Sequence, residues 1–321
     1  MTARYLDEPH DAASEAVRPA ALPKRAWLSA AMRAAETLGK ENLSLVAAGC
    51  AFYALLALAP GLAALAGIYG FFADPSHISR HLDLLEDVAP PDAYRLIADQ
   101  AAALAEAQRG TLGWTSLGAL ALALWSARAG VRALMIGVGI AYRERDKRPF
   151  FKALAATLAL TLSLATLVAL ALGLVVVVPG VLALVPLAPS TELLGSLLRW
   201  PIAVAALIVG LALLYRYGPA RRSARIAWLT PGSLTALAIW LVVSIAFSAY
   251  LSRFGNYNET YGALGAVAAL LMWFWLSALA ALFGATLNAE LELATAADTT
   301  VGEDRPMGVR GAFVADHVTG P

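Results

Sequence analysis

Long apolar stretches separated by charged segments dominate the pattern of this chain. Six of them are almost free of Asp, Glu, Lys and Arg, and a helix needs about 20 such residues to cross the hydrocarbon core of a bilayer. The predicted spans are residues 43–73, 111–131, 153–178, 200–217, 226–252 and 260–289. The pattern therefore predicts an all-α integral membrane protein, a bundle of about six transmembrane helices with amphipathic interfacial helices.

The third apolar stretch is too long for a single crossing. It continues for 39 residues without a charge, and the Pro179-Gly180 pair interrupts it. Because proline and glycine break helices at such positions, we place the crossing at residues 153–178. Residues 181–189 then form a re-entrant or interfacial piece, or half of a helical hairpin, and the sequence leaves open whether they enter the membrane.

The segments outside the spans define the expected domain organisation. Residues 24–293 form the transmembrane domain, and within it the acidic segment 74–110 has the periodicity of an external amphipathic helical connection. Residues 1–23 and 294–321 lack a long apolar run and contain charges and proline, and the second segment also contains several glycines. We expect both to be disordered cytoplasmic tails, and the first has no apolar core of a secretory signal.

Lys and Arg are unevenly distributed among the connections. The two ends of the chain, together with the second and fourth connections, hold 17 of them, whereas the three intervening connections hold five. Because cytoplasmic segments carry the excess of Lys and Arg, both termini are expected in the cytoplasm. The predicted location is the bacterial inner (cytoplasmic) membrane, with the chain crossing it several times.

Composition agrees with a membrane protein and argues against several other classes. The chain is 60% hydrophobic and 15% charged, with a net charge of +1, whereas soluble domains carry about 25% charged residues. The charge gives no support for binding nucleic acid. The single cysteine excludes an intrachain disulfide, and hydrolase and zinc-binding motifs are absent from the sequence. We expect no catalytic residues, no metal site and no cofactor.

Two features of the spans indicate a binding site for an amphiphile. Arg128 and Arg132 are one helical turn apart where the second predicted span ends, and paired guanidinium groups suit a phosphate head group. Pro60 and Gly61 lie near the centre of the first span, where such a pair often marks a broken or kinked helix that lines a cavity. The competing interpretations are an interfacial anchor for the arginines and a kink that serves packing alone.

A second candidate site lies at the inner end of the last span. Glu290 is close to the end of that helix, where the helix dipole disfavours a carboxylate. We therefore expect it to pair with a cytoplasmic arginine. Together with Asn288 and Arg216, it would form a latch or part of a gate.

Several short motifs resemble, in their order and spacing, those of the YihY/BrkB family of bacterial inner membrane proteins, once described as ribonuclease BN-like. The resemblance covers about residues 27–293. It rests on Ala47-Ala48-Gly49-Cys50-Ala51-Phe52-Tyr53, Trp125-Ser126, Ala141-Tyr142, Arg148-Pro149, Tyr215-Arg216-Tyr217-Gly218-Pro219, Pro231-Gly232, Tyr257-Asn258-Glu259-Thr260-Tyr261-Gly262 and Gly284-Ala285-Thr286-Leu287-Asn288-Ala289-Glu290. The resemblance implies an all-helical inner membrane protein without a firmly assigned activity.

Three functions follow in order of preference. The first is movement of a lipid or other amphiphile across or out of the membrane, with membrane lipids as partners. The second is a non-catalytic scaffold in envelope assembly, in which the external connection binds envelope proteins. A ribonuclease ranks last, because the sequence offers no acid–base or metal cluster and no nucleic-acid partner is expected. The small residues of the last span also admit a homo-oligomer.

Overall fold

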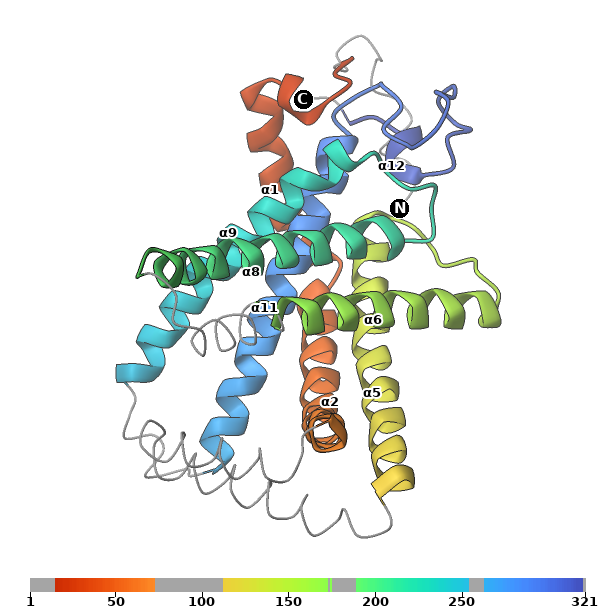
Figure 1. Ribbon diagram of the computed structural model, residues 1–321. Coiled ribbons are helices and arrows are strands. Elements are labelled where there is room, and N and C mark those ends of the chain that lie inside the picture. The colour runs from red at the N-terminus through yellow and green to blue at the C-terminus, as the bar shows by residue number, and fades with distance from the viewer. Residues whose placement is uncertain (1–14, 73–111, 173, 175–188, 254–262, 320–321) are drawn as a thin grey trace. The chain divides into compact units, whose positions relative to one another are not determined.

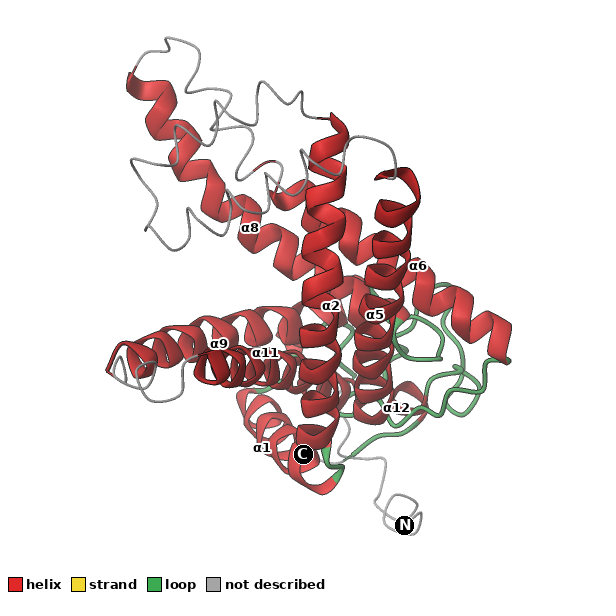
Figure 2. Ribbon diagram, turned by 90° about the horizontal axis from the view of Figure 1, so that it is seen from below, coloured by secondary structure: helices red, strands yellow, loops and turns green. Residues whose placement is uncertain are grey.

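The computed structural model describes residues 15–72, 112–172, 174, 189–253 and 263–319, and these are mainly helical (Figures 1 and 2). The elements are η2 (Pro19–Ala21), α1 (Lys24–Lys40), α2 (Leu43–Phe72), α5 (Leu112–Ala141), α6 (Phe150–Leu172), α8 (Pro189–Tyr217), α9 (Ile226–Arg253), α11 (Ala263–Glu292) and α12 (Phe313–Asp316). Ala224 and Thr300 form an isolated antiparallel β-bridge. The all-α class is confirmed.

The chain divides into two compact units. Unit 1 comprises residues 1–51 and 130–321, and unit 2 comprises residues 52–129. The boundary falls within two continuous helices, because α2 and α5 each begin in one unit and end in the other. In unit 1, α11 packs against α9 and α1, while α8 packs against α6 and α9.

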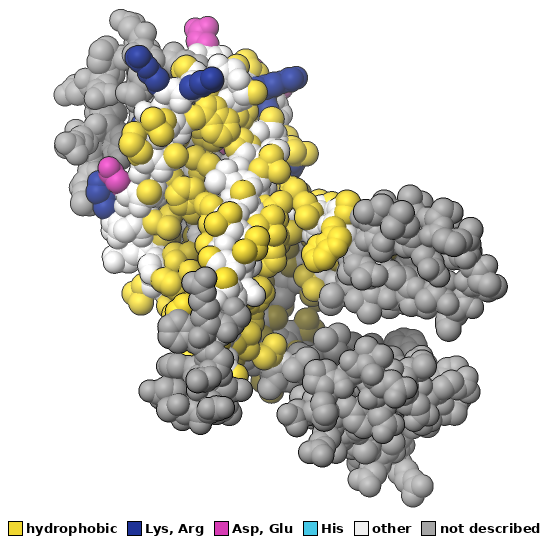
Figure 3. Space-filling model, turned by 90° about the vertical axis from the view of Figure 1, so that its left-hand side faces the viewer, with side chains coloured by type: hydrophobic (Ala, Val, Ile, Leu, Met, Phe, Trp, Pro, Cys, Tyr) yellow, Lys and Arg dark blue, Asp and Glu magenta, His cyan; other side chains and the backbone are white. Residues whose placement is uncertain are grey.

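Among the described residues, five helices are long and apolar enough to cross a membrane. Their qualifying segments are Ala121–Ala141, Phe150–Ala171, Trp200–Tyr217, Ile226–Leu251 and Gly265–Glu292. The bent pair Lys24–Lys40 and Leu43–Leu58, whose axes differ by 69°, would bring the number to six if it forms one broken span. Apolar side chains cover much of the face shown in Figure 3, and Lys and Arg side chains gather at one end of it.

Three helices differ in length from the predicted spans. α5 continues ten residues beyond the predicted end at residue 131, because residues 133–141 contain no proline or charge that would stop it. α8 begins at Pro189, well before the predicted residue 200. α6 begins at Phe150, directly after Pro149, whose carbonyl accepts the N–H of Ala153. The question of residues 181–189 concerns a segment that lies almost wholly outside the described residues.

The crossing of α9 and α11 depends on two glycines. A Cβ added to Gly232 would collide with the carbonyl oxygen of Gly284, and a Cβ added to Gly284 would collide with the carbonyl oxygen of Gly232. The two backbones therefore approach more closely than any side chain would allow, as small residues permit in membrane helices. Tyr215 of α8 adds a third helix to this crossing, because its hydroxyl donates a hydrogen bond to the carbonyl of Ala281 at 2.7 Å.

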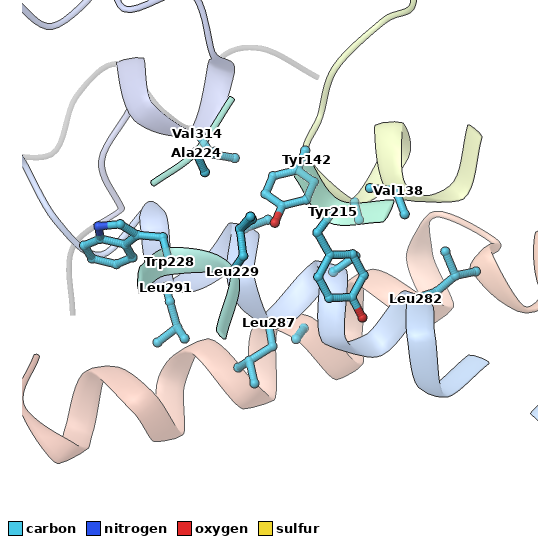
Figure 4. Close-up of a cluster of buried hydrophobic side chains, with 14 of the residues drawn as sticks. Val138, Tyr142, Tyr215, Ala224, Trp228, Leu229, Leu282, Leu287, Leu291 and Val314 are labelled. Carbon is cyan, nitrogen blue, oxygen red and sulfur yellow. The ribbon is translucent and has the colours of Figure 1, made fainter. Parts of the chain in front are cut away.

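A cluster of buried apolar side chains lies beside this crossing. Tyr142, Tyr215, Trp228 and Leu282 are among its largest fully buried side chains, and they come from α8, α9, α11 and the end of α5. Figure 4 shows Tyr142 and Tyr215 close to Leu229 and Val138. Since the spanning helices are otherwise mostly exposed along their length, packing is concentrated at one end of the unit.

The helix α1 packs on α11 through a stripe of alanines. Ala26, Ala30 and Ala34 are buried at successive turns, so the two helices approach closely. The opposite face carries Leu28 and Met32, which are exposed. α1 is therefore attached to the last long helix by its alanine face and presents exposed apolar side chains on the opposite face.

The prediction of disordered tails is wrong for residues 15–23 and for residues 294–319, which are ordered parts of unit 1. Residues 1–14 and 320–321 lie outside the described part. Ala16 and Leu22 are buried, and the carbonyl of Ala16 accepts a hydrogen bond from the Thr295 hydroxyl at 2.8 Å. Both tails thus join one structure, which we call the polar end and define as residues 15–42, 139–149, 216–225 and 289–319.

Polar contacts hold much of the C-terminal segment in place, together with the buried side chains of Ala312, Val314 and Ala315. The buried guanidinium of Arg310 donates hydrogen bonds to the carbonyls of Ala296, Ala297, Arg305 and Ala315. The glycines that suggested disorder adopt positive φ angles of 76° to 99°, which favour glycine. These residues are Gly302, Gly308 and Gly311.

Candidate functional site

A buried carboxylate at the end of α11 is shared by two arginines. The side chain of Glu290 is 2% exposed. Its Oε2 accepts a hydrogen bond from Arg33 Nε at 2.8 Å, and its Oε1 accepts one from Arg143 Nη2 at 2.6 Å. Arg33 belongs to α1 and Arg143 follows α5, so this carboxylate joins three helices that are distant in sequence. Charge-assisted pairs of this kind are stronger than neutral hydrogen bonds.

The backbone of Arg143 is in the left-handed region, with φ of 58°. A residue with a side chain adopts this conformation at a cost of about 1–2 kcal/mol, and glycine is the usual residue directly after a helix. The conformation lets the N–H of Glu144 return to the carbonyl of Gly139 at 2.8 Å and close the end of α5. The chain has an arginine at a position that favours glycine, and its ion pair with Glu290 compensates for the strain.

A second buried carboxylate, Glu292, points to the other side of α11. Two positions along a helix correspond to a rotation of about 200°. Glu292 accepts two hydrogen bonds from Arg221, at 2.8 and 3.0 Å, and both side chains have no exposed surface. Thr299 donates a third at 2.7 Å, and the guanidinium of Arg221 lies 4.1 Å from the ring centroid of Tyr142. The pair is thus dry, bidentate and stacked on an aromatic ring.

The groups around Arg221 keep its guanidinium positively charged. Burial alone would lower the pKa of its guanidinium, but the adjacent carboxylate of Glu292 outweighs this effect and raises it. Removing either partner would leave an unpaired buried charge, which is why such pairs are costly to break.

Asn288 joins α9 to α11 at the point where a proline interrupts the hydrogen bonding of α9. Its side-chain oxygen accepts the N–H of Gly232 at 2.7 Å, and its amide nitrogen donates to the carbonyl of Leu229 at 3.1 Å. Pro231 lies inside α9 and cannot donate a backbone hydrogen bond. Asn288 is fully buried, so it supplies hydrogen bonds to a helix that water cannot reach at this position.

The predicted latch is therefore partly different from the observed cluster. Glu290 does pair with arginine, as predicted, and its partners are Arg33 and Arg143. Arg216, which the predicted latch grouped with it, is not part of this ion-pair cluster in the described residues. Arg216 lies in the last turn of α8, where its guanidinium lies 5.6 Å from the ring centroid of Tyr217. Asn288 instead supports the crossing of α9 and α11, because the two side-chain hydrogen bonds described above go to the backbone of α9.

Sequence reasoning missed Glu292 and Arg221 as a buried pair. The signal was present, because Glu292 is as close to the end of the last helix as Glu290, and several arginines lie in the connection 216–225. The choice of partner could not be derived, since it depends on how that connection folds over the end of α11.

The two arginines of α5 lie deeper in their helix than predicted. Because α5 continues to Ala141, Arg128 and Arg132 fall inside the qualifying segment Ala121–Ala141 and no longer at its end. Arg128 packs on the exposed ring of Trp125, 4.4 Å from its centroid, and its Nε is buried without a hydrogen-bond partner. Within the described part of the chain, no carboxylate forms an ion pair with either arginine.

The helix α2 continues through Pro60 and Gly61, so the interpretation of a broken helix is wrong. A single proline removes one hydrogen bond, and the remaining bonds of a 30-residue apolar helix keep it continuous. The side chains there, and the acidic connection 74–110, lie outside the described residues. The cavity predicted at this pair stays a prediction.

The polar end contains one carboxyl group whose pKa is raised. Burial raises the pKa of Glu144, although the N–H of Phe313 donates a hydrogen bond to its Oε1 at 2.6 Å and counteracts this effect. In the part of the chain that the structure describes, no group of three or more His, Cys, Asp or Glu side chains is arranged to hold a metal ion.

Comparison with known proteins places the chain among membrane proteins without an assigned mechanism. Residues 34–307 match the family described as Virulence factor BrkB. The putative ribonuclease-like protein YfkH of Bacillus subtilis is 30% identical over 245 residues, which is 75% of this chain and 87% of that protein. A UPF0761 membrane protein of Xanthomonas campestris is 36% identical over 93 residues, 29% of this chain and 22% of that protein. No solved structure matches.

Proposed function

We propose that this chain, which belongs to the Virulence factor BrkB family of membrane proteins, moves a phosphate-bearing lipid or similar amphiphile across or out of the bilayer by a non-enzymatic mechanism. The observation that carries the proposal is the position of Arg128 and Arg132 within an apolar helix. Charged residues inside membrane spans are costly, and they mark substrate or ion pathways more often than packing sites.

The geometry of α5 supports phosphate as the ligand of these arginines. One turn of helix separates them by about 6 Å along the helix axis, so both can contact one head group. A guanidinium group binds phosphate through two parallel hydrogen bonds. The stacking of Arg128 on Trp125 orients its guanidinium group while its Nε lacks a protein partner.

The ion pairs of Glu290 fit the role of a latch in this proposal. Arg143 follows the C-terminal end of α5, the helix that carries the two candidate arginines. Arg33 lies on α1, and α1 is the helix that precedes the bend into α2. If the ion pair with Glu290 fixes the C-terminal end of α5, Arg128 and Arg132 stay at a constant depth in the membrane. We therefore propose that the cluster around Glu290 anchors the pathway and does not contact the substrate.

We further propose that the polar end faces the cytoplasm of a bacterium, in the inner membrane. The cation-rich segments contact one another there, through Arg148 and Pro219, Arg222 and Gly311, and Glu144 and Phe313. Such contacts require these segments to share one side of the membrane. The excess of Lys and Arg supports the cytoplasmic side.

The experiment is lipid movement in proteoliposomes, followed with a head-group-labelled phospholipid and an impermeant quencher. Wild-type protein is expected to move the lipid faster than protein-free vesicles. Each lost charged hydrogen bond costs about 1.5–3 kcal/mol, so Arg128→Gln/Arg132→Gln should slow movement at least about tenfold. Arg18→Gln/Arg305→Gln removes two exposed charges elsewhere and should have no effect. Movement equal to that of protein-free vesicles would contradict the proposal.

A further inference from the structure

Two neighbouring segments use their cations differently. In the connection 216–225, Arg221 pairs with Glu292, Arg222 lies 3.7 Å from a carboxylate oxygen of Asp298, and Arg225 pairs with Asp304. These arginines hold the protein together. An outward set lies between the end of α5 and the first turn of α6, where Arg145, Lys147 and Lys152 are exposed.

Two aromatic side chains lie within the outward set. Phe150 and Phe151, the first residues of α6, are 74% and 79% exposed and are among the most exposed large apolar side chains described. Their rings contact each other edge to face, with centroids 5.4 Å apart. The run Lys147-Arg148-Pro149-Phe150-Phe151-Lys152 thus brackets an apolar pair with cations at the start of a helix that qualifies as a membrane span.

Hydrogen bonds within this segment and to the connection after α8 hold it in one conformation. Arg148 turns inward and donates a hydrogen bond to the carbonyl of Pro219 at 2.8 Å. The carboxylate of Asp146, directly before this run, accepts a hydrogen bond from the backbone N–H of Arg148 at 3.0 Å. The acidic side chain next to the exposed cations is therefore engaged in a local hydrogen bond. Ala153 is buried and starts the regular hydrogen bonding of α6. The exposed residues are therefore presented by an ordered support.

We infer that residues 145–152, which we call the lipid-facing segment, bind the head groups of anionic phospholipids. The cations Arg145, Lys147 and Lys152 contact the phosphate groups, and Phe150 and Phe151 enter the boundary between head groups and acyl chains. Juxtamembrane basic clusters are attracted to anionic leaflets, and aromatic side chains prefer this boundary. This inference stands whether or not the protein moves lipid.

A lipid surface explains this composition better than a protein partner does. The segment opens a membrane span, so head groups lie at the same level as its cations if α6 crosses the bilayer from Phe150. Protein interfaces are depleted in lysine, whereas this surface combines two lysines with its aromatic pair. The positive charge complements an anionic leaflet, and the apolar pair requires a non-aqueous neighbour.

The test measures which lipids contact the segment in the full-length protein. The chain's single cysteine, Cys50, is replaced by alanine, and Phe150→Cys is labelled with bimane, because the chain's eight tryptophans would obscure a tryptophan reporter. The protein is reconstituted in phosphatidylcholine nanodiscs that contain a small fraction of brominated phosphatidylglycerol or brominated phosphatidylcholine. Quenching of the label by the two brominated lipids is compared at equal mole fraction.

Brominated phosphatidylglycerol is expected to quench more strongly, because each cation near the surface enriches anionic lipid by up to about fivefold at low salt. Lys147→Gln/Lys152→Gln should strongly reduce the preference, leaving only the contribution of Arg145, and Arg18→Gln/Arg305→Gln, which removes the same charge elsewhere, should leave it unchanged. Raised salt should weaken it in the protein without lysine substitutions.

The inference is overturned if neither lipid quenches the label, which would place the segment in water or against a protein. Equal quenching by both lipids, or a preference that persists at high salt, would overturn its electrostatic basis. If the Phe150→Cys protein does not fold, Phe151→Cys labelled in the same way provides the same comparison.

Discussion

At the residue scale, the organisation of the polar end depends on two carboxylates at one helix end. Glu290 and Glu292 are two positions apart and therefore face different neighbours: the first pairs with Arg33 and Arg143, and the second with Arg221. Each carboxylate would be costly if alone, because burial and the dipole of α11 both disfavour its charge. The paired arginines make these charges the connectors between α11 and the segments around it.

Glu290→Gln should therefore destabilise the protein markedly. The substitution removes the negative charge that compensates two partly buried arginines, and breaking a buried pair costs about 3 kcal/mol. We expect a clearly lower thermal midpoint in detergent micelles. Glu36→Gln is the matched control, since Glu36 pairs with Lys40 in an exposed contact, and it should leave the midpoint unchanged. Equal midpoints for Glu290→Gln and wild type would contradict the assigned role.

At the element scale, the close crossing of α9 and α11 explains why particular residue types occur there. Gly232 and Gly284 permit contact between the two backbones, and Asn288 hydrogen-bonds to the backbone of α9 on both sides of Pro231, at Gly232 and Leu229. α1 follows the same logic with alanines. Helix packing of this kind depends on small residues and specific hydrogen bonds rather than on bulky apolar cores.

Gly284→Ala should separate α9 from α11, because the new methyl group would collide with the backbone of Gly232. Overpacking of this kind costs about 1–3 kcal/mol, and the thermal midpoint should fall. Gly49→Ala is the control, since a Cβ there meets no neighbour within 4 Å. The account of the crossing is wrong if the two substitutions have the same effect.

Much of the helical arrangement could be predicted from the chain alone, and the reasons are physical. Long charge-free runs avoid water, so the spans follow from composition. Five of the six predicted spans have qualifying helices among the described residues, and the bent pair of α1 and α2 provides the sixth if it forms one broken span. Helix ends were less predictable: the end of the second span was placed too early, directly before Arg132, although the helix tolerates both arginines and continues to Ala141.

The candidate site was less predictable than the helices. The need of Glu290 for an arginine follows from its place in the helix, but its partners are 257 and 147 residues away and depend on tertiary structure. The sequence of the C-terminal segment predicts a disordered tail, because its glycines and charges resemble those of disordered chains. Arg310 and Asp298 order it through backbone hydrogen bonds that leave no hydrophobic pattern in the sequence.

At the scale of the whole molecule, the polar end joins segments from the entire length of unit 1. The C-terminal segment contacts the start of the described chain, the connection after α5 and the connection after α8. Asp298 is central to it. Burial alone would raise the pKa of this carboxyl, but hydrogen bonds from Thr300 and from the N–H of Arg305 outweigh that effect and lower it.

This lowered pKa predicts how the segment responds to acid. The stability that ionised Asp298 contributes is present above its ordinary pKa of 3.8 and is lost as the pH falls through the lower value of the folded state. Asp298→Asn should lower the thermal midpoint at pH 7, and the difference from wild type should shrink as the pH falls below about 4. A difference that is constant over pH 3–7 would show that the charge of Asp298 contributes nothing.

The central claim is that Arg128 and Arg132 of α5 recognise phosphate while a lipid crosses the membrane. Its most direct test is the rate at which the reconstituted protein moves two lipids with identical acyl chains, one with a phosphate head group and one with an uncharged sugar head group. The account predicts that wild type moves the phospholipid faster and that Arg128→Gln/Arg132→Gln abolishes this preference. Equal rates for both lipids, unaffected by the double substitution, would contradict it.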